Sequence, residues 1–326
     1  MDQTFAFSSW GRIVGRRRRR RLLAVATACV VMSAGLGLVT GPQVAGASLG
    51  GRPGSGYWML GSDGVVYPFG TARACPDPLG TSTGLNPLSP DAGQLGVAIV
   101  PMPDGLGYWA LESDGFGGGF VEIFNCPNQP LDDYLHYEGN NFVTGLRAGE
   151  VPTSLSALPN GSGYWVFTNL GRAIPFGAAQ WYGDMGNVHL NGPVLGSVAT
   201  PSGHGYYMVA SDGGIFCFGD AHFHGSMGSV RLNKPVVSMA PTPNGRGYWL
   251  VASDGGIFAF NAPFYGSMGS VRLNRPVVGM VPSPTGHGYL MVASDGGIFT
   301  FGDVPFHGSL GSSPPYWPIT SVAVMP

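Results

Sequence analysis

Acidic side chains recur at one position of this 326-residue sequence and are the first candidates for chemistry. Each stands just before a glycine in a similar phrase: Asp63, Asp114, Asp212, Asp254 and Asp295. A ring of carboxylates could bind calcium or supply an acid and a base. A calcium loop needs further acidic ligands at fixed offsets, and the phrase "SDGGIF" has none. Because aspartate is also a common turn residue whose side chain bonds nearby amides, we interpret these residues as turn formers.

Two further groups could serve a metal or a sugar bond. His222 and His224 alternate on a predicted strand and so share a face, but a third zinc ligand is missing, because Tyr265 stands where His224 and His307 stand in other copies. Asp132, Asp133 and Glu138 could form the acid and base of a glycosidase. Nothing apolar surrounds them to raise a pKa, so a solvated loop is the better interpretation.

Common enzyme motifs are not evident in the sequence. It contains no phosphate-binding loop or zinc-helix motif, and Gly-x-Ser-x-Gly occurs only as "GASLG" at 46–50 and "GTSTG" at 80–84, neither at a predicted strand-to-helix elbow. We therefore predict neither a cofactor nor a metal, and we favour a protein that is not an enzyme.

The basic residues are unevenly placed. Five of the nine that follow residue 47 fall within 45 positions: Arg231, Lys234, Arg246, Arg272 and Arg275. Solvated loop charge is one interpretation. The other is a shallow site for an anionic ligand on one sector of the molecule.

Cysteine usage permits one disulfide. Cys75 and Cys126 each lie 19 residues after the glycine of a repeated "GY" and each precedes a proline. Export would allow them to pair, although equivalent positions in neighbouring repeats are usually too far apart for a disulfide. Cys217 is interpreted as a small core residue.

The first 47 residues predict export. Arg16 to Arg21 precede an apolar stretch from Leu22 to Thr40, and "AGA" at 45–47 supplies small residues for a signal peptidase. We expect cleavage after Ala47, by either the general or the twin-arginine route, with an uncleaved membrane anchor as the alternative. Nine basic and seventeen acidic residues remain in 48–326, and this acidic balance argues against nucleic-acid binding.

The elements that position these residues are repeats. Six "GY" anchors begin at Gly56, Gly107, Gly163, Gly205, Gly247 and Gly288. The copy at 235–274 predicts four strands, "VVSMAPT", "GYWLVAS", "GIFAF" and "FYGSMG", separated by Asn-Gly and Asp-Gly turns. A four-stranded antiparallel unit of about 40–45 residues is typical of a β-propeller blade. Residues 48–326 are therefore predicted to form an all-β, six-bladed propeller, with the Tyr/Trp pair of each unit packing between blades.

These phrases also carry a resemblance. "GYWLVASDGGIFAF" and "FYGSMGSVRLN" resemble a repeat of secreted actinobacterial proteins, over residues 56–326. The resemblance implies a propeller and an exported protein at the cell envelope, but no reaction. The period is more distantly similar to WD-repeat and kelch propellers.

The two ends of the repeat region predict how the ring closes. The first unit reaches "GYWMLGSDG" without a first strand of its own, whereas "PITSVAVMP" at 318–326 matches "PVVSMAPTP" at 235–243. We expect Ile319–Val324 to lie antiparallel to Tyr57–Leu60, innermost in that blade. This pairing removes two open sheet edges.

Two functions from different classes follow. The first is a secreted, monomeric binding or scaffold module that recognises a cell-wall glycan, an anionic polymer or an envelope protein. The alternative is a secreted glycosidase or lyase with acidic loop residues at the mouth of the channel. An enzyme should gather two acids and an aromatic side chain with perturbed pKa values.

Overall fold

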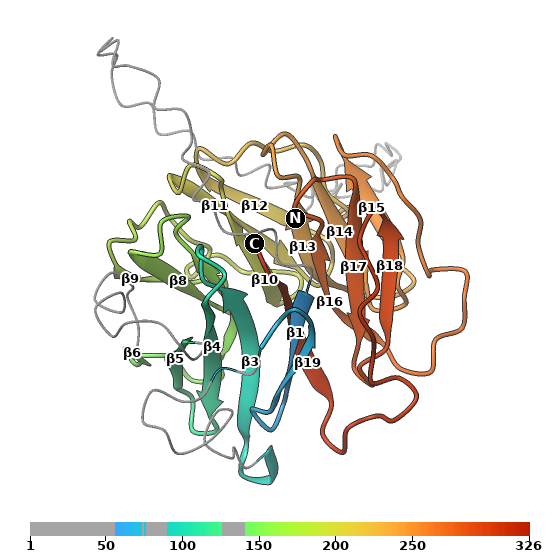
Figure 1. Cartoon of the computed structure of the whole chain (residues 1–326). Helices are drawn as coiled ribbons and strands as arrows, with labels where there is room; N and C mark the ends of the chain where they lie inside the picture. Colours follow the sequence, from blue (N-terminus) through green and yellow to red (C-terminus); the bar gives the residue numbers. More distant parts are fainter. Residues whose placement is uncertain (1–55, 74, 76–89, 126–140) are drawn as a thin grey trace, which may run out of the picture.

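The computed structural model describes residues 56–73, 75, 90–125 and 141–326. They form six antiparallel sheets arranged as blades around a central axis, with one short 3₁₀ helix, η1 (Pro90–Ala92) (Figure 1). The fold is a six-bladed β-propeller, as the repeat predicts.

The innermost strands come from six places in the chain. They are β19 (Ile319–Val324), β3 (Gln94–Pro101), β7 (Pro152–Ala157), β10 (Val194–Ala199), β13 (Val236–Pro241) and β16 (Val277–Pro282). Each contacts the innermost strand of the next blade, and β16 contacts β19 in turn. The ring is therefore closed.

The middle and third strands build each blade outward. The middle strands are β1 (Gly56–Gly61), β4 (Gly107–Asp114), β8 (Gly163–Thr168), β11 (Gly205–Ala210), β14 (Tyr248–Ala252) and β17 (Gly288–Ala293). The third strands are β2 (Val66–Gly70), β5 (Gly119–Asn125), β9 (Ala173–Gly177), β12 (Ile215–Gly219), β15 (Ile257–Phe260) and β18 (Ile298–Gly302). The Asp-Gly turns between them need a left-handed residue: Gly255 has φ +80°, and an added Cβ would lie 2.6 Å from Met268.

Blade 1 combines the two ends of the described chain, as predicted. Its strand order is β19-β1-β2, and Tyr57 lies opposite Val324 (Figure 1). The match continues past the strand, because the amide of Met325 donates to the carbonyl of Gly56 at 3.0 Å. The corresponding bond in blade 5 joins Thr242 to Gly247 at 2.9 Å.

The expected fourth strand differs from the prediction. Among the described residues, a fourth strand is formed only in blade 2, by β6 (Asn141–Val143). The segment "FYGSMG" is irregular because its amides bond elsewhere: that of Tyr265 donates to the Tyr289 hydroxyl at 3.1 Å, and that of Met268 to the Gly255 carbonyl at 2.9 Å. The outer segment thus joins its blade to the next.

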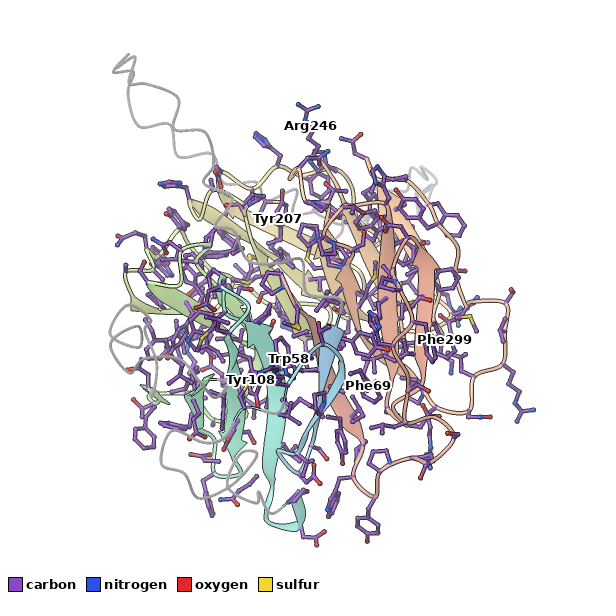
Figure 2. All side chains as sticks on the ribbon, viewed as in Figure 1. Trp58, Phe69, Tyr108, Tyr207, Arg246 and Phe299 are labelled. Carbon is purple, nitrogen blue, oxygen red and sulfur yellow. The ribbon has the colours of Figure 1, made fainter. Side chains whose placement is uncertain are left out.

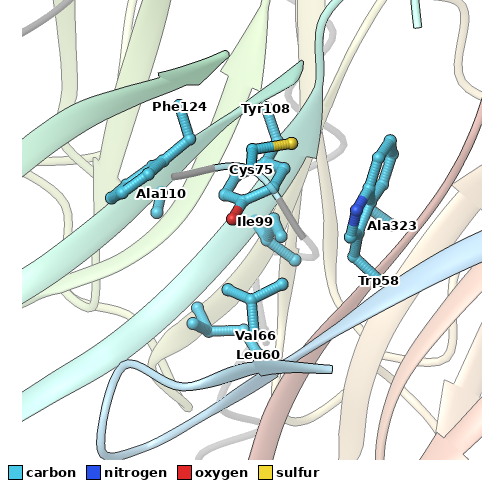
Figure 3. Packing of buried hydrophobic residues seen from close by; sticks show 9 residues of the cluster. All are labelled: Trp58, Leu60, Val66, Cys75, Ile99, Tyr108, Ala110, Phe124 and Ala323. Carbon is cyan, nitrogen blue, oxygen red and sulfur yellow. The ribbon is translucent and has the colours of Figure 1, made fainter. Parts of the chain in front are cut away.

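The core lies between the blades. Tyr248 packs toward blade 4, whereas Trp249 packs toward blade 6, so the pair faces both ways as predicted. The aromatic contact is repeated at five interfaces: Trp58–Tyr108, Trp109–Tyr164, Trp165–Tyr206, Tyr207–Tyr248 and Trp249–Tyr289, with ring centroids 5.3 to 6.5 Å apart. At the sixth, Leu290 and Tyr57 share a cluster. Figure 3 shows the interface of blades 1 and 2, where Trp58 and Tyr108 lie among Leu60 and Val66.

Candidate binding face

The propeller has two faces, which we name by their turns. The first-turn face carries the turns between innermost and middle strands, such as residues 242–247. The second-turn face carries the turns between middle and third strands, such as residues 253–256, and the last residues of each connector to the next blade. A loop residue therefore belongs to one face according to the turn that holds it.

The recurring aspartates shape the turns of the second-turn face. The Oδ1 of Asp254 accepts from the amide of Gly256 at 3.0 Å, and that of Asp212 from Gly214 at 2.8 Å. Asp114 accepts from two amides of its turn, those of Phe116 and Gly118, both at 2.8 Å. These contacts agree with the interpretation of the aspartates as turn formers.

Unit 3 has Leu170 in place of the turn aspartate and uses a buried acid instead. Glu150 is 1% exposed; it accepts from the Thr168 hydroxyl at 2.7 Å, from Arg172 Nη1 at 2.9 Å and from the Arg147 amide at 2.8 Å. Burial alone would raise the pKa of Glu150, but these three donors outweigh it and hold the pKa below its usual range. Glu150 and its three donors stabilise the loop. In the sequence, the only sign that this turn is built differently was the leucine in place of the aspartate.

His224 and His307 pack between blades. The His224 ring lies 5.6 Å from that of Tyr248, and its amide donates to the Tyr248 hydroxyl at 3.0 Å. Burial lowers the pKa of His224, and neighbouring His222 lowers it further. Within the described parts of the chain, no three His, Cys, Asp or Glu side chains come close enough to hold a metal ion.

The side chains that line the central cavity are either apolar or carry a hydroxyl group. It has a volume of about 640 Å³ and is lined by the innermost strands, with Met239 and Met280 among small residues and prolines. Ser197 Oγ lies 2.8 Å from the hydroxyls of both Ser154 and Ser156. No charged side chain or histidine is part of this lining, so the described wall offers neither a general acid nor a base.

The five predicted basic residues do not form one group. Arg246 lies in the turn 242–247, on the first-turn face, and Figure 2 shows it at the edge of the molecule. The other four precede β13 or β16 on the second-turn face: Arg231, Lys234, Arg272 and Arg275. The separation has a simple cause, because a strand carries the chain from one face to the other between Lys234 and Arg246.

We call the four remaining residues the basic sector, and three of them border a shallow hollow. Lys234, Arg272 and Arg275 line a space of about 330 Å³ together with Ser253 and Asp254. All four basic residues are exposed, and within the described residues none forms an ion pair. Their charge is therefore available to an anion from outside.

An aromatic pair on the same face was missed from the sequence. Tyr316 is 91% exposed, and its ring lies perpendicular to that of Trp317 with centroids 5.1 Å apart. The pair stands in the connector from β18 to β19, where the two preceding connectors have Asn233 and Lys234, and Asn274 and Arg275. The exchange of polar for aromatic residues in an otherwise regular repeat could have revealed it.

A partly buried pair of acids was also missed. Glu112 lies opposite Phe120, and Glu122 opposite Ala110, so both carboxyls lie on one face of blade 2 as diagonal neighbours. Burial raises the pKa of Glu112 to about 8, with a further contribution from the charge of Glu122. The unit at 235–274, for example, has Ala252 and Phe258 at these positions. The replacement of such uncharged residues by two glutamates could have revealed the pair.

The remaining predictions involve residues that are described only in part. Cys75 takes part in a disulfide and is fully buried. Its predicted partner Cys126, the acids Asp132, Asp133 and Glu138, and the leader 1–47 lie outside the described residues. In the described ranges, no helix has the length and apolar character needed to cross a bilayer.

Comparison with solved structures shows distant similarity to other chains. No family model matches the chain, and a search of curated proteins finds no match either. Among solved structures, the β-propeller domain of Cps50 (Swd1) from Myceliophteria thermophila is similar with 13% identity and a TM-score of 0.42. The match covers 64% of this chain and 65% of that one. At this level of similarity we draw no functional argument from it.

Proposed function

We propose that this protein is a secreted, non-catalytic binding module of the bacterial cell envelope that recognises an anionic polymer through the basic sector. The observation that carries the proposal is the hollow between Lys234, Arg272 and Arg275, whose cationic groups have no ion-pair partner in the described residues. Arginine binds carboxylate and phosphate in a fork geometry, which suits a polymer that carries either group.

Export and envelope location are part of this proposal. They rest on the basic and apolar run before Ala47 and on the resemblance to secreted actinobacterial repeats. The N-terminus of the exported chain, read by mass spectrometry, tests the signal. A start near Ser48 supports cleavage, and full-length chain in membranes supports the anchor instead.

Charge reversal tests the binding proposal. Exchange of Arg231, Lys234, Arg272 and Arg275 for glutamate should abolish salt-sensitive binding of the full chain to a teichoic-acid-like polymer. The melting temperature should change little, because exposed residues without partners contribute little to stability. Arg246→Glu is the matched control, since this exposed arginine lies on the other face. Equal binding by the reversed variant, or equal loss in the control, would reject the basic sector as the site.

One observation favours the alternative of a glycosidase or lyase. Burial and the charge of neighbouring Glu122 raise the pKa of Glu112 to about 8, and a carboxyl that stays protonated near neutral pH is what a general acid requires. They lie on the blade face that carries Tyr108, which is fully buried, and neither lines the central cavity. This function would be established instead if the wild type hydrolysed a polysaccharide and the Glu112→Gln variant did not.

A further inference from the structure

We propose that Tyr316 and Trp317 form a sugar-stacking platform beside the basic sector, and that the ligand is therefore an acidic polysaccharide rather than a polyanion of any kind. This inference rests on the proposed function and specifies its ligand. The two features that it joins are the aromatic pair, in which Tyr316 is exposed and Trp317 half-buried, and Arg275 of the preceding connector.

The first step is that the connectors carrying them lie side by side. The amide of Ser294 donates to the carbonyl of Pro276, and the carbonyl of Ser294 accepts from the amide of Ile319, both at 2.9 Å. Arg275 directly precedes Pro276, and Trp317 stands two residues before Ile319. A single residue of blade 6 therefore separates the end of one connector from the end of the other.

The second step is that the same arrangement already forms a hollow one blade earlier. There the amide of Ser253 donates to Pro235 and its carbonyl accepts from Val277. The hollow of about 330 Å³ lies between Lys234 on one side and Arg272 and Arg275 on the other. Lys234, Arg275 and Trp317 occupy the same position in three successive connectors. The repeat therefore places Arg275 relative to Trp317 as it places Lys234 relative to Arg275.

The third step is the chemistry of the exchange. Asn274 and Arg275 are replaced by Tyr316 and Trp317, so one wall of this second site is aromatic while the facing wall keeps its arginine. An aromatic ring stacks against the apolar face of a sugar ring, and a guanidinium donates hydrogen bonds to a carboxylate. A chain of acidic sugars supplies both groups in each unit.

The fourth step is preorganisation. Pro314, Pro315 and Pro318 flank the pair and fix their own φ angles, which restricts this connector before any ligand arrives. The rings already hold a perpendicular contact, and Tyr316 leaves almost its whole side chain to solvent. Rigid aromatic side chains lose little conformational entropy on binding, which makes them effective anchors.

Three probes separate the contributions of sugar and charge. The full chain is titrated with polygalacturonate, with neutral dextran and with polyphosphate, which carries charge but no sugar. We expect the wild type to bind polygalacturonate more tightly than polyphosphate and to bind dextran weakly. The Tyr316→Ala/Trp317→Ala variant should bind polygalacturonate about tenfold more weakly and keep its affinity for polyphosphate.

The controls make the outcomes distinct. Trp181→Ala removes an exposed tryptophan from blade 3 and should change neither affinity. Tyr316→Ala alone serves if loss of the half-buried Trp317 lowers the melting temperature. Unchanged binding of polygalacturonate, or an equal loss of polyphosphate binding, overturns the platform while the basic sector stands. Failure of the wild type to bind either polyanion overturns the proposed function itself.

Discussion

At the scale of single residues, the repeat makes exceptions visible. Five tyrosine hydroxyls of the "GY" anchors have hydrogen-bond partners in the preceding blade; Tyr289, for example, donates to the Gly266 carbonyl at 2.6 Å. The Tyr108 hydroxyl is buried and, like Glu112 Oε1, has no hydrogen-bond partner among the described residues. Burial raises the pKa of Tyr108, and the charge of Glu122 adds to the increase. Blade 2 therefore has two buried polar atoms without a hydrogen-bond partner among the described residues.

Glu112 predicts a pH dependence of stability. Its folded-state pKa of about 8 exceeds the ordinary glutamate value of 4.5, so between these pH values the folded state keeps the proton that the unfolded state has released. The free energy of unfolding should therefore fall as the pH rises from 5 to 8, by about 2–4 kcal/mol. Urea unfolding at both pH values measures the change.

Glu112→Gln should remove most of this dependence, because the amide stays neutral at every pH. Asp91→Asn is the control, since Asp91 is exposed. A wild-type free energy of unfolding that does not fall between pH 5 and pH 8 would contradict the assignment.

At the scale of elements, five of the six middle strands carry one aromatic residue toward each neighbouring blade, and β17 has Leu290 on one side instead. Trp249 is fully buried, its Nε1 donates to the Pro263 carbonyl at 2.6 Å, and its ring packs against Tyr289. Unit 4 has Tyr207 at this place, and its hydroxyl accepts from the His222 amide at 3.0 Å. In five of the six units, the residue after the anchor tyrosine is therefore a large aromatic ring with a polar group at its tip.

Trp249→Ala should destabilise the fold by about 3–5 kcal/mol, the scale for emptying a large buried aromatic site. Trp249→Tyr should cost markedly less, because unit 4 shows that a tyrosine fits. Chemical denaturation of both variants gives the comparison. A Trp249→Ala variant that kept its stability but lost a glycan ligand would show that the ring binds rather than packs.

At the scale of the whole molecule, the six blades share one closed arrangement. Each innermost strand touches two others, so no blade is at an end. Blade 1 depends on β19, whose register with β1 runs from Tyr57–Val324 to Gly61–Ile319. Even the last residue takes part, since an added Cβ on Gly105 would lie 3.5 Å from Pro326.

Deletion of residues 318–326 should therefore destabilise the entire ring. It exposes the edges of β1 and of the strands beside β19, and it opens the cores on both sides of blade 1. We expect one cooperative transition at a much lower temperature, rather than loss of blade 1 alone, in differential scanning calorimetry. Thr320→Ala is the control, because it keeps the strand and removes one hydroxyl bond to Leu60. An unchanged main transition in the deleted chain would show that the blades are independent.

The architecture could be predicted from the sequence because each copy of the repeat forms one blade. Anchor glycines, Asp-Gly turns and the match of 318–326 to 235–243 were enough for blade number and closure. The outer segment was predicted as a strand but is irregular. The Tyr265 amide bonds the Tyr289 hydroxyl of the neighbouring blade, the Met268 amide bonds the Gly255 carbonyl of its own blade, and neither bond leaves a local pattern in the sequence. Arg246 was grouped with residues of the opposite face because nearness in sequence was taken for nearness in space.

Blade 1 also has a consequence for the order of folding. Blades 3 to 6 are each built from one continuous stretch of chain, whereas Thr320 bonds Leu60 across 260 positions. Contacts of such long range form late, because the intervening chain must be ordered before they can hold. We therefore expect the docking of β19 on β1 to be the final and slowest step, at which an open arc becomes a ring.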